Sequence, residues 1–170
     1  MVTIRPATDG DVPAITEITN ALLTTTTYEW TETLHTVEER RAWLTSRQAG
    51  GWPVLVADDD GTVLGWTGYG EFRDSTKWPG YRFCVEHTIH VAQGHWSAGV
   101  GRRLMDALIR TAREAGLWAM VGGIDGTNER SIRFHERLGF REVARMRGIG
   151  EKAGKRLDLV LVQLDLVPLG

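Results

Sequence analysis

The stretch HWSAGVGRRLMDAL, residues 95–108, governs how the rest of this chain is interpreted. Two glycines stand just before apolar residues that recur at helical spacing, which predicts a tight turn that opens a helix. The first N–H groups of a helix have no partner within it and carry partial positive charge. A glycine-opened helix can therefore bind a phosphate through its backbone, although a plain turn has the same sequence pattern.

Around this stretch the sequence predicts alternating strands and helices. The most specific local signals are DDDG at 58–61, typical of a hairpin, and Thr36 with Glu39, which match a helix capping box. The strands are expected at residues 2–5, 53–57, 63–69, 81–91, 117–124, 140–147 and 157–166, and the helices at 13–22, 37–49, 100–115 and 128–138. This order, β-α-α-β-β-β-α-β-α-β-β, predicts one α/β domain.

Composition and charge limit the classes of protein that fit. The chain has 170 residues, 42% of them hydrophobic, which suffices for one core. A net charge of −2 gives no reason to expect nucleic acid or an anionic membrane as partner. Cys84 is the one cysteine, and neither a secretory signal nor an apolar run of about 18–20 residues is present. We therefore expect a soluble, cytoplasmic protein.

Two better-known phosphate loops do not fit residues 95–108. A dinucleotide-binding fingerprint needs G-x-G-x-x-G after the first strand, whereas Leu104 takes the place of the third glycine, after four predicted strands. A Walker loop needs Gly-Lys-Ser/Thr, which does not follow here. The remaining interpretation is a helix N-terminus with Arg102 and Arg103 in its first turn, which suits a pyrophosphate.

Several motifs, in order along the chain, resemble those of the GNAT superfamily of N-acetyltransferases. They are IRPAT at 4–8, WSAGVG at 96–101 and N-x-x-S-x-x-x-H-x-x-x-G-F at 128–140. A narrower resemblance, to the phosphinothricin and methionine sulfone (sulfoximine) acetyltransferase-like family, rests on VEHTIHV at 85–91, MVGGIDGTNERSIRFHERLGF at 120–140 and KRLDLVLVQ at 155–163. The chain departs from that family at Trp96, where Arg is usual, and at Lys155-Arg156, where Arg-Trp is usual.

The resemblance implies a single GNAT domain over residues 1–170. Such a domain has a mixed, mostly antiparallel seven-stranded sheet with about four helices, and a splayed central strand pair binds acetyl-coenzyme A. The resemblance places the pantetheine along the backbone of residues 89 and 91 and the pyrophosphate on the amides of residues 96–101. The expected cofactor-binding residues are His87, Ile89, Val91, Trp96, Ser97, Ala98, Gly99, Val100, Gly101, Arg102, Asn128 and Ser131. Arg102 and Arg103 are expected to supply the charge that position 96 lacks.

Glu86 is the expected catalytic base. An amino-acid α-amine is largely protonated at neutral pH, so a base must take a proton before the nitrogen attacks. Glu86 lies in the apolar run FCVEHTIHV, where partial burial raises the pKa of a carboxyl, and it matches the family's base. The alternative is a strand glutamate paired with an arginine. His87 and His90 are neighbouring alternatives for the base, although His87 should face away from Glu86 on a strand.

His135 matches the position from which the family donates a proton to the departing thiolate, but packing beside Leu138 is the alternative. Asn128 can cap its helix or bind the cofactor. Cys84 has no evident activating base, which favours direct transfer over an acyl-enzyme. His87, His90 and His95 lack the spacing of a metal site, so we expect no metal.

The acceptor is expected to contact two segments that resemble the family's substrate-binding regions. Arg73 can clamp a carboxylate, while Trp78 and Tyr81 wall the pocket or simply pack. Thr26 and Tyr28 lie in TTTTYEW, residues 24–30. The resemblance implies a homodimeric enzyme that acetylates the α-amine of a small amino acid or analogue, such as phosphinothricin or methionine sulfone or sulfoximine, with a link to resistance. The alternatives are a broader amine or peptide N-acetyltransferase, a non-catalytic acyl-coenzyme A sensor and a structural dimer module.

Overall fold

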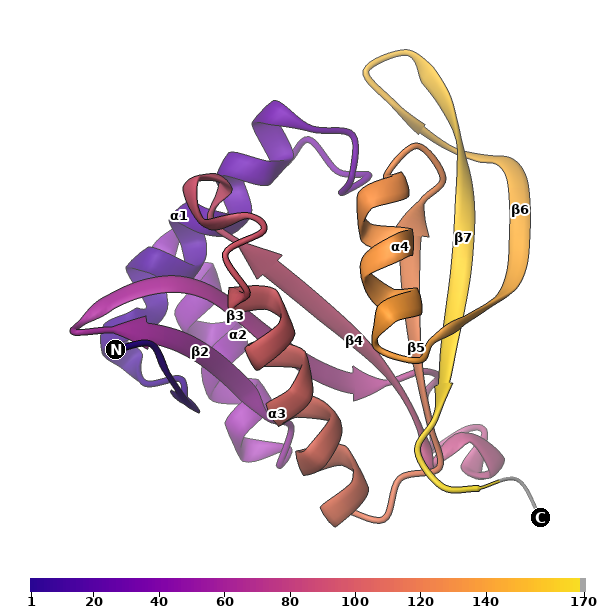
Figure 1. The fold of residues 1–170 in the computed structure, drawn as a ribbon, viewed down its shortest axis with the longest axis horizontal. Helices are drawn as coiled ribbons and strands as arrows, with labels where there is room; N and C mark the ends of the chain where they lie inside the picture. The colour runs from indigo at the N-terminus through magenta and orange to yellow at the C-terminus, as the bar shows by residue number, and fades with distance from the viewer. Residues whose placement is uncertain (169–170) are drawn as a thin grey trace. The chain divides into compact units, whose positions relative to one another are not determined.

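The computed structural model describes residues 1–168, and over these residues the elements follow the predicted order (Figure 1). The strands are β1 (Thr3–Pro6), β2 (Val54–Asp59), β3 (Thr62–Glu71), β4 (Cys84–Val91), β5 (Ala119–Asp125), β6 (Arg141–Lys152) and β7 (Lys155–Asp165). The helices are α1 (Val12–Thr25), α2 (Val37–Ala49), α3 (Val100–Glu114) and α4 (Glu129–Arg137). The predicted α/β architecture with four helices is confirmed.

The strands form one mixed sheet in the order β1-β2-β3-β4-β5-β7-β6. β1 with β2, β2 with β3, β5 with β7 and β6 with β7 are antiparallel, whereas β4 and β5 are parallel. The parallel ladder pairs Cys84–Glu86 with residues 119–121, and within the described residues it ends there. The ladder between the central strands is therefore short, as the splayed pair of the expected fold requires.

Two predicted strand boundaries differ from the observed ones by three residues or more. The run from residue 81 does not begin as a strand, because Pro79–Tyr81 forms a 3-10 turn in which the Tyr81 amide donates to the Trp78 carbonyl at 3.0 Å. The strand predicted to end at residue 147 continues to Lys152. Gly148, with φ of 60°, lies in a bulge of this strand instead of ending it.

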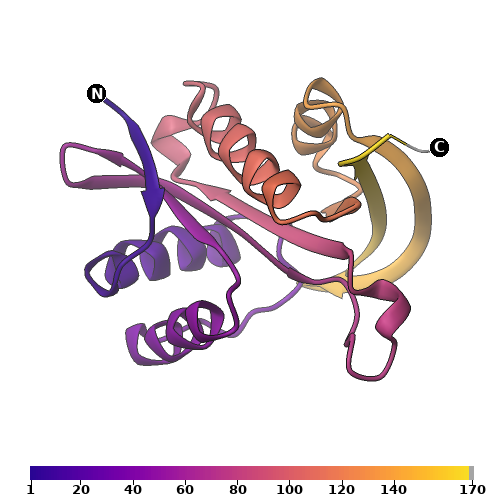
Figure 2. The same ribbon diagram turned by 90° about the horizontal axis from the view of Figure 1, so that it is seen from below.

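One of two compact units comprises Met1–Ala21, Leu34–Gly70 and His87–Ala115. In this unit α1 and α2 lie on one face of β1–β3 and α3 lies on the other (Figure 2). Ile15, Leu44 and Trp66 belong to the apolar cluster beneath α1 and α2. The capping box that begins α2 is formed as predicted, since the Thr36 hydroxyl accepts from the Glu39 amide at 3.1 Å.

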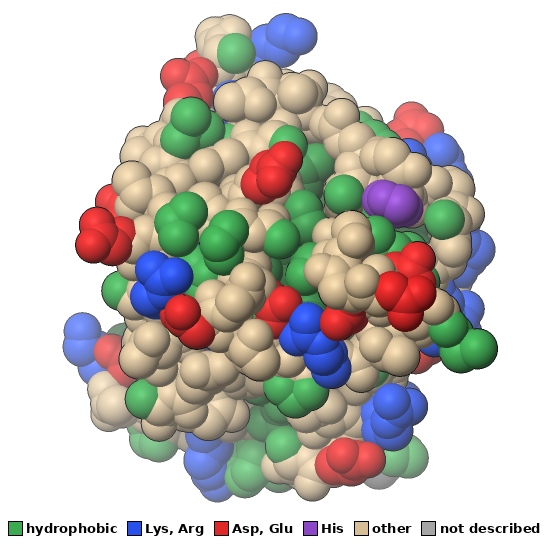
Figure 3. Space-filling view, turned by 90° about the vertical axis from the view of Figure 1, so that its left-hand side faces the viewer, with side chains coloured by type: hydrophobic (Ala, Val, Ile, Leu, Met, Phe, Trp, Pro, Cys, Tyr) green, Lys and Arg blue, Asp and Glu red, His purple; other side chains and the backbone are tan. Residues whose placement is uncertain are grey.

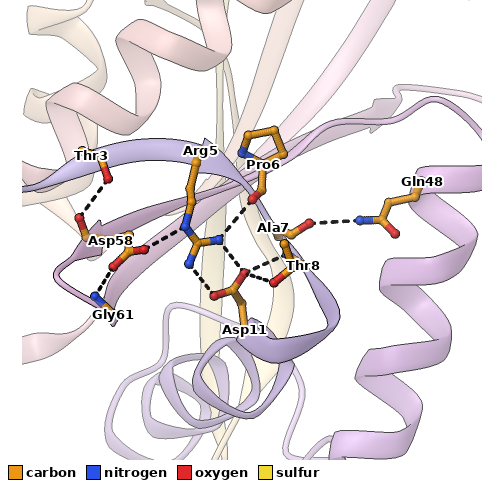
Figure 4. Close-up of polar contacts among 9 residues, drawn as sticks. All are labelled: Thr3, Arg5, Pro6, Ala7, Thr8, Asp11, Gln48, Asp58 and Gly61. Atoms are coloured by element: carbon orange, nitrogen blue, oxygen red, sulfur yellow. Dashed lines mark hydrogen bonds and ion pairs between the residues drawn. The ribbon is translucent and has the colours of Figure 1, made fainter.

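Arg5, from the IRPAT motif, joins β1 to the start of the first helical segment and to β2 (Figure 4). Its guanidinium donates to both Asp11 oxygens at 2.7 and 2.8 Å and to Asp58 at 2.8 Å. The bonds from Arg5 are the largest of the effects that lower the pKa of Asp11 to about 2. Arg5 of the motif therefore has a structural role, since it holds β1 to β2 and to the first helical segment.

The other unit comprises Leu22–Thr33, Glu71–Glu86 and the chain from Gly116 onward. It contains the parallel β4–β5 ladder, the long β6–β7 hairpin and α4, which contacts β6. The hairpin turns at Ala153 and Gly154, whose φ angles of 51° and 73° match a two-residue loop.

Acidic and basic side chains are interspersed on the face drawn in Figure 3. This distribution agrees with the near-neutral charge of the chain. Among the described residues, no helix has the length and apolar character that a membrane crossing requires.

Candidate active site

The glycine stretch forms an exposed loop between β4 and α3. A 3-10 turn, Gln93–His95, follows β4, and the backbone at Ser97 and Gly99 takes φ of 65° and 83°. Gly99 is the N-cap of α3, and a Cβ placed there would meet no atom within 4 Å. No side chain caps this helix, so the loop has both the orphan first-turn amides and the open space that an anion needs.

Trp96, where the resemblance leads one to expect Arg, is bound to the end of β4. Its indole Nε1 donates to the Val91 carbonyl at 2.7 Å, and the side chain is half-buried. Val91 was expected to pair with pantetheine through its backbone. The Trp96 indole occupies one of the two lone pairs of the Val91 carbonyl oxygen. The second lone pair is still able to accept a hydrogen bond, so the predicted pairing stays a prediction.

The two arginines at the start of α3 have partners within the chain. Arg102 Nε donates to both oxygens of Asp106, at 3.1 and 3.0 Å, and Arg103 donates to the Val2 carbonyl at 2.5 Å. Asp106 offsets the charge of Arg102 one helical turn away from the loop. The fit to a pyrophosphate therefore rests on backbone amides more than on these cations.

Glu86 is the last residue of β4 in the parallel ladder, opposite Val121 of β5. Burial along β4 alternates, so that His87 is 7% exposed while Glu86 remains open to solvent, as the sequence predicted. Partial desolvation nonetheless raises the pKa of Glu86. Burial is the cause of this shift and no arginine contributes to it, which weakens the alternative of a glutamate paired with an arginine.

Gly123 of β5 leaves room beside the Glu86 carboxylate. A Cβ at Gly123 would lie 3.5 Å from Glu86 Oε1 and 3.4 Å from a methyl group of Leu159. A larger side chain would fill the space next to the carboxylate. Glu86 Oε1 thus lies beside a position of β5 at which glycine contributes no side chain, and this suits a base that acts on a bound amine or on a water.

His135 is buried in α4, with 2% of its surface exposed. Its Nδ1 lies 2.8 Å from the Ser131 carbonyl, so Nδ1 carries the proton and donates it there. Burial lowers the pKa of His135, and the ring also packs edge-on against Phe134 and Phe140. A neutral ring fixed in this way supports the packing alternative, and its role as proton donor stays a prediction.

Asn128 is the N-cap of α4, where its Oδ1 accepts from the Ser131 amide at 3.1 Å. The capping alternative is therefore confirmed, while cofactor contacts of Asn128 and Ser131 stay predictions. Cys84 has a raised pKa because it is half-buried and, secondarily, because it lies near Glu86. A protonated thiol is a poor nucleophile, in keeping with direct transfer.

The loop after β3 holds three of the predicted acceptor residues. The Arg73 guanidinium lies over the rings of Phe72 and Tyr81, at 5.5 and 5.7 Å. Trp78 is 60% exposed. The loop joins β4 where the Phe72 amide donates to the Cys84 carbonyl at 3.3 Å, two residues before Glu86.

The other segment that the sequence predicts to contact the acceptor, with Thr26 and Tyr28, is held at the far end of β5. Asp125 is buried and accepts from Trp30 Nε1 at 3.1 Å and from the Thr127 amide and hydroxyl, both at 2.7 Å. Burial alone would raise the pKa of Asp125, but these donors together with Thr27 lower it.

The two predicted acceptor segments are thus attached to different strands, one at Cys84 of β4 and the other at Asp125 of β5. Glu86 lies about 7 Å along β4 from Cys84, and Gly123, beside the Glu86 carboxylate, lies about 7 Å along β5 from Asp125. Glu86 is therefore between the two points of attachment. The sequence interpretation did not single out Asp125 or Trp30. The hydrogen bond between Trp30 and Asp125 joins residues 95 positions apart, which local patterns do not predict. The one local signal for it is an aspartate at the end of an apolar strand.

Among the described residues, no group of three or more His, Cys, Asp or Glu side chains is arranged to hold a metal ion.

Comparisons with known proteins agree with this arrangement. The sequence model of the "Acetyltransferase (GNAT) family" matches residues 15–140. The chain is 42% identical to the L-methionine sulfoximine/L-methionine sulfone acetyltransferase of Salmonella typhimurium over 165 residues, which cover 97% of this chain and 95% of the relative. It is 32% identical to the phosphinothricin N-acetyltransferase of Streptomyces coelicolor over 168 residues, 97% of this chain and 96% of the relative.

A solved structure extends the similarity to three dimensions. The yncA protein of Salmonella typhimurium, solved with its cofactor acetyl-CoA, matches with a TM-score of 0.94 and 39% identity, over 100% of this chain and 96% of that one. The sheet order, the glycine loop before α3 and Glu86 at the end of the central ladder are thus accompanied by full-length similarity in sequence and structure. The chain belongs to the GNAT acetyltransferase family.

Proposed function

We propose that this protein transfers the acetyl group of acetyl-CoA to the α-amino group of a small amino-acid-like acceptor, of the methionine sulfone, methionine sulfoximine or phosphinothricin type. The observation that carries the proposal is the Glu86 carboxylate, which is partly desolvated, beside Gly123, at the end of the β4–β5 ladder. The relatives that act on such acceptors match almost the whole chain. Residues 1–170 act as a single catalytic domain in this proposal.

Each group has a defined task in the proposed reaction. The loop amides before α3 bind the pyrophosphate of the acetyl donor, and the pantetheine follows the end of β4. Glu86, directly or through a water, takes a proton from the ammonium form of the acceptor, so that a neutral nitrogen attacks the thioester carbonyl carbon. The new C–N bond replaces the C–S bond, coenzyme A leaves as the thiolate, and the second proton that the nitrogen loses on becoming an amide goes to that thiolate, directly or through water. The thioester supplies the activated acyl group, so no covalent enzyme intermediate is needed.

Arg73 is the proposed contact for the carboxylate of the acceptor. Its guanidinium lies over two rings on an exposed loop, where its charge is available to a bidentate anion. In this proposal Thr26 and Tyr28 also contact the acceptor, and Trp78 and Tyr81 contribute apolar surface to its binding site. A homodimer, a cytoplasmic location and a role in resistance to such amino-acid analogues complete the proposal, and the dimer is tested by light scattering in solution.

The function is tested by following thiol release from acetyl-CoA with a panel of amino acids that includes methionine sulfone, methionine sulfoximine and phosphinothricin. The parent protein is compared with Glu86→Gln and with Glu114→Gln, a control at the exposed end of α3. We expect turnover of at least one panel member by the parent and by the control, and a loss of about 100-fold in Glu86→Gln. Binding of acetyl-CoA without any turnover would favour a sensor, and the absence of binding would favour a structural module.

A further inference from the structure

The segment Leu22–Thr33, which comprises the last turn of α1 and the chain that follows it toward α2, is held by a buried lysine. Lys152, at the end of β6, is only 6% exposed, and its Nζ donates to the Leu23 carbonyl at 2.8 Å and to the Glu29 carbonyl at 2.7 Å. The two carbonyls are six residues apart along the chain. One ammonium group therefore closes the intervening residues, with Thr26 and Tyr28 among them, into a loop.

The position of Lys152 suits the end of a helix. Leu23 lies in the last turn of α1, where carbonyl groups have no partner within the helix and the helix dipole favours a cation. Both acceptors of Lys152, the Leu23 and Glu29 carbonyls, are neutral backbone oxygens. A buried ammonium without a carboxylate is costly, and a hydrophobic side chain would fill the same volume at lower cost, so packing alone does not account for lysine here.

Trp30 gives the same segment a second anchorage. Its Nε1 donates to the buried Asp125, and its ring lies against Gly150 of β6, where a Cβ would come within 2.2 Å of the ring. The Ala153 amide also donates to Glu32 Oε1 at 3.3 Å. Lys152, Asp125 and the Ala153 amide thus hold the segment Leu22–Thr33 to β5 and to the β6–β7 hairpin.

We propose that Lys152 and Asp125 are positioning residues that set the affinity for the acceptor by holding Leu22–Thr33 in place. The inference rests on the proposed function, in which Thr26 and Tyr28 contact the acceptor. Neither Lys152 nor Asp125 touches the substrate itself. Asp125 is two residues beyond Gly123 on β5, so the segment is fixed with respect to the strand that adjoins the base.

The test uses Lys152→Met, the conservative Lys152→Arg, and Lys155→Met as a matched control on the exposed part of the same hairpin. Lys152→Met should raise KM for the best acceptor about tenfold, with KM for acetyl-CoA changed less than twofold. Lys152→Arg should restore at least half of the lost affinity, because a guanidinium can also donate to two carbonyls. Lys155→Met should behave as the parent.

A milder variant keeps the test informative if Lys152→Met fails to fold. Gly150→Ala displaces the Trp30 ring without removing a charge, and it should raise KM for the acceptor about three- to tenfold. Amide hydrogen exchange at residues 24–30 should accelerate in both variants, whether or not the protein is active. Faster exchange with unchanged KM for the acceptor, or an equal rise in KM for both substrates, would overturn the proposal.

The two claims fail in different ways. Absence of turnover in the parent would contradict the proposed function, while the exchange measurement would still report whether Lys152 holds the segment. Exchange at residues 24–30 that is unchanged in a folded Lys152→Met protein would contradict the positioning role even with an active parent.

Discussion

The indole Nε1 of Trp96 donates a hydrogen bond to the Val91 carbonyl at 2.7 Å, and it thereby ties the loop before α3 to the end of β4. Arg at position 96, which is usual in the family that the sequence resembles, would place a positive charge at this loop. Trp96 has no charge and instead fixes the loop through its hydrogen bond. Trp96→Phe keeps an aromatic ring, smaller than the indole, but removes the donor, and loss of that hydrogen bond costs about 1 kcal/mol. We expect KM for acetyl-CoA to rise about fivefold with kcat unchanged, as measured by steady-state kinetics.

Trp96→Arg provides the matching comparison for that position. A guanidinium near the loop should make KM for acetyl-CoA more dependent on salt than in the parent protein, because the added attraction is screened. Equal salt dependence in both proteins would show that position 96 lies too far from the phosphates to act on them.

Arg73 is expected to bind the acceptor carboxylate. Arg73→Met should raise KM for the acceptor at least tenfold, because a charge-assisted hydrogen bond contributes about 1.5–3 kcal/mol. Lys77→Met, on the same loop, removes a cation paired with Asp74 at 3.8 Å and serves as the control. Similar effects of both variants would indicate general attraction by positive charge rather than a specific contact.

His135→Asn separates packing from proton donation. Asparagine places an N–H close to the position of Nδ1 and preserves the bond to the Ser131 carbonyl, but it lacks Nε2. Since the pKa of His135 is lowered and its proton is engaged, we expect kcat within threefold of the parent and a melting temperature lower by several degrees. A 100-fold loss of kcat in a folded variant would establish His135 as the acid.

The Arg5–Asp11 ion pair should make stability depend on pH in the acid range. The pKa of Asp11 is about 2 in the folded chain against an ordinary value near 4, which corresponds to about 2 kcal/mol. The contribution is complete above pH 4 and is lost as the pH falls through 2. Denaturant unfolding of Asp11→Asn should therefore show lower stability at pH 7 and a flatter profile below pH 4.

The exposed Asp60→Asn is the control for that measurement, because the Asp60 side chain is 92% exposed. If Asp11→Asn and Asp60→Asn lose the same free energy of unfolding, the partly buried Arg5–Asp11 ion pair has no special role.

The order of the elements could be predicted because each depends on local signals. The capping box at Thr36 and the DDDG hairpin fix their segments within a few residues, and strand alternation could place Glu86 and His87 on opposite faces, whereas the choice of Glu86 as base also needed the family resemblance. The extension of β6 past Gly148 could not, since a glycine with positive φ ends a strand or bulges it according to the partner strand.

The contacts that hold the segment Leu22–Thr33 could not be predicted from local sequence patterns. Lys152 and Leu23 are 129 residues apart in the chain, and their contact arises only when β6 has paired with β7 and α1 has ended nearby. The sequence interpretation singled out the threonines of this segment and not the lysine that holds it. Similarly, the bond from Trp96 to Val91 depends on the path of a loop whose φ angles at Ser97 and Gly99 are positive.

The central claim is that Glu86 acts as the base, and the pH dependence of kcat/KM for the acceptor tests it most directly. In the parent protein, the acid limb should follow a pKa above the ordinary glutamate value of about 4.3, since burial raises the pKa of Glu86. Glu86→Gln should lose about 100-fold of the plateau rate and should also lose that limb, with KM for acetyl-CoA within twofold of the parent. An acid limb and a plateau rate that are the same in both proteins would contradict the account.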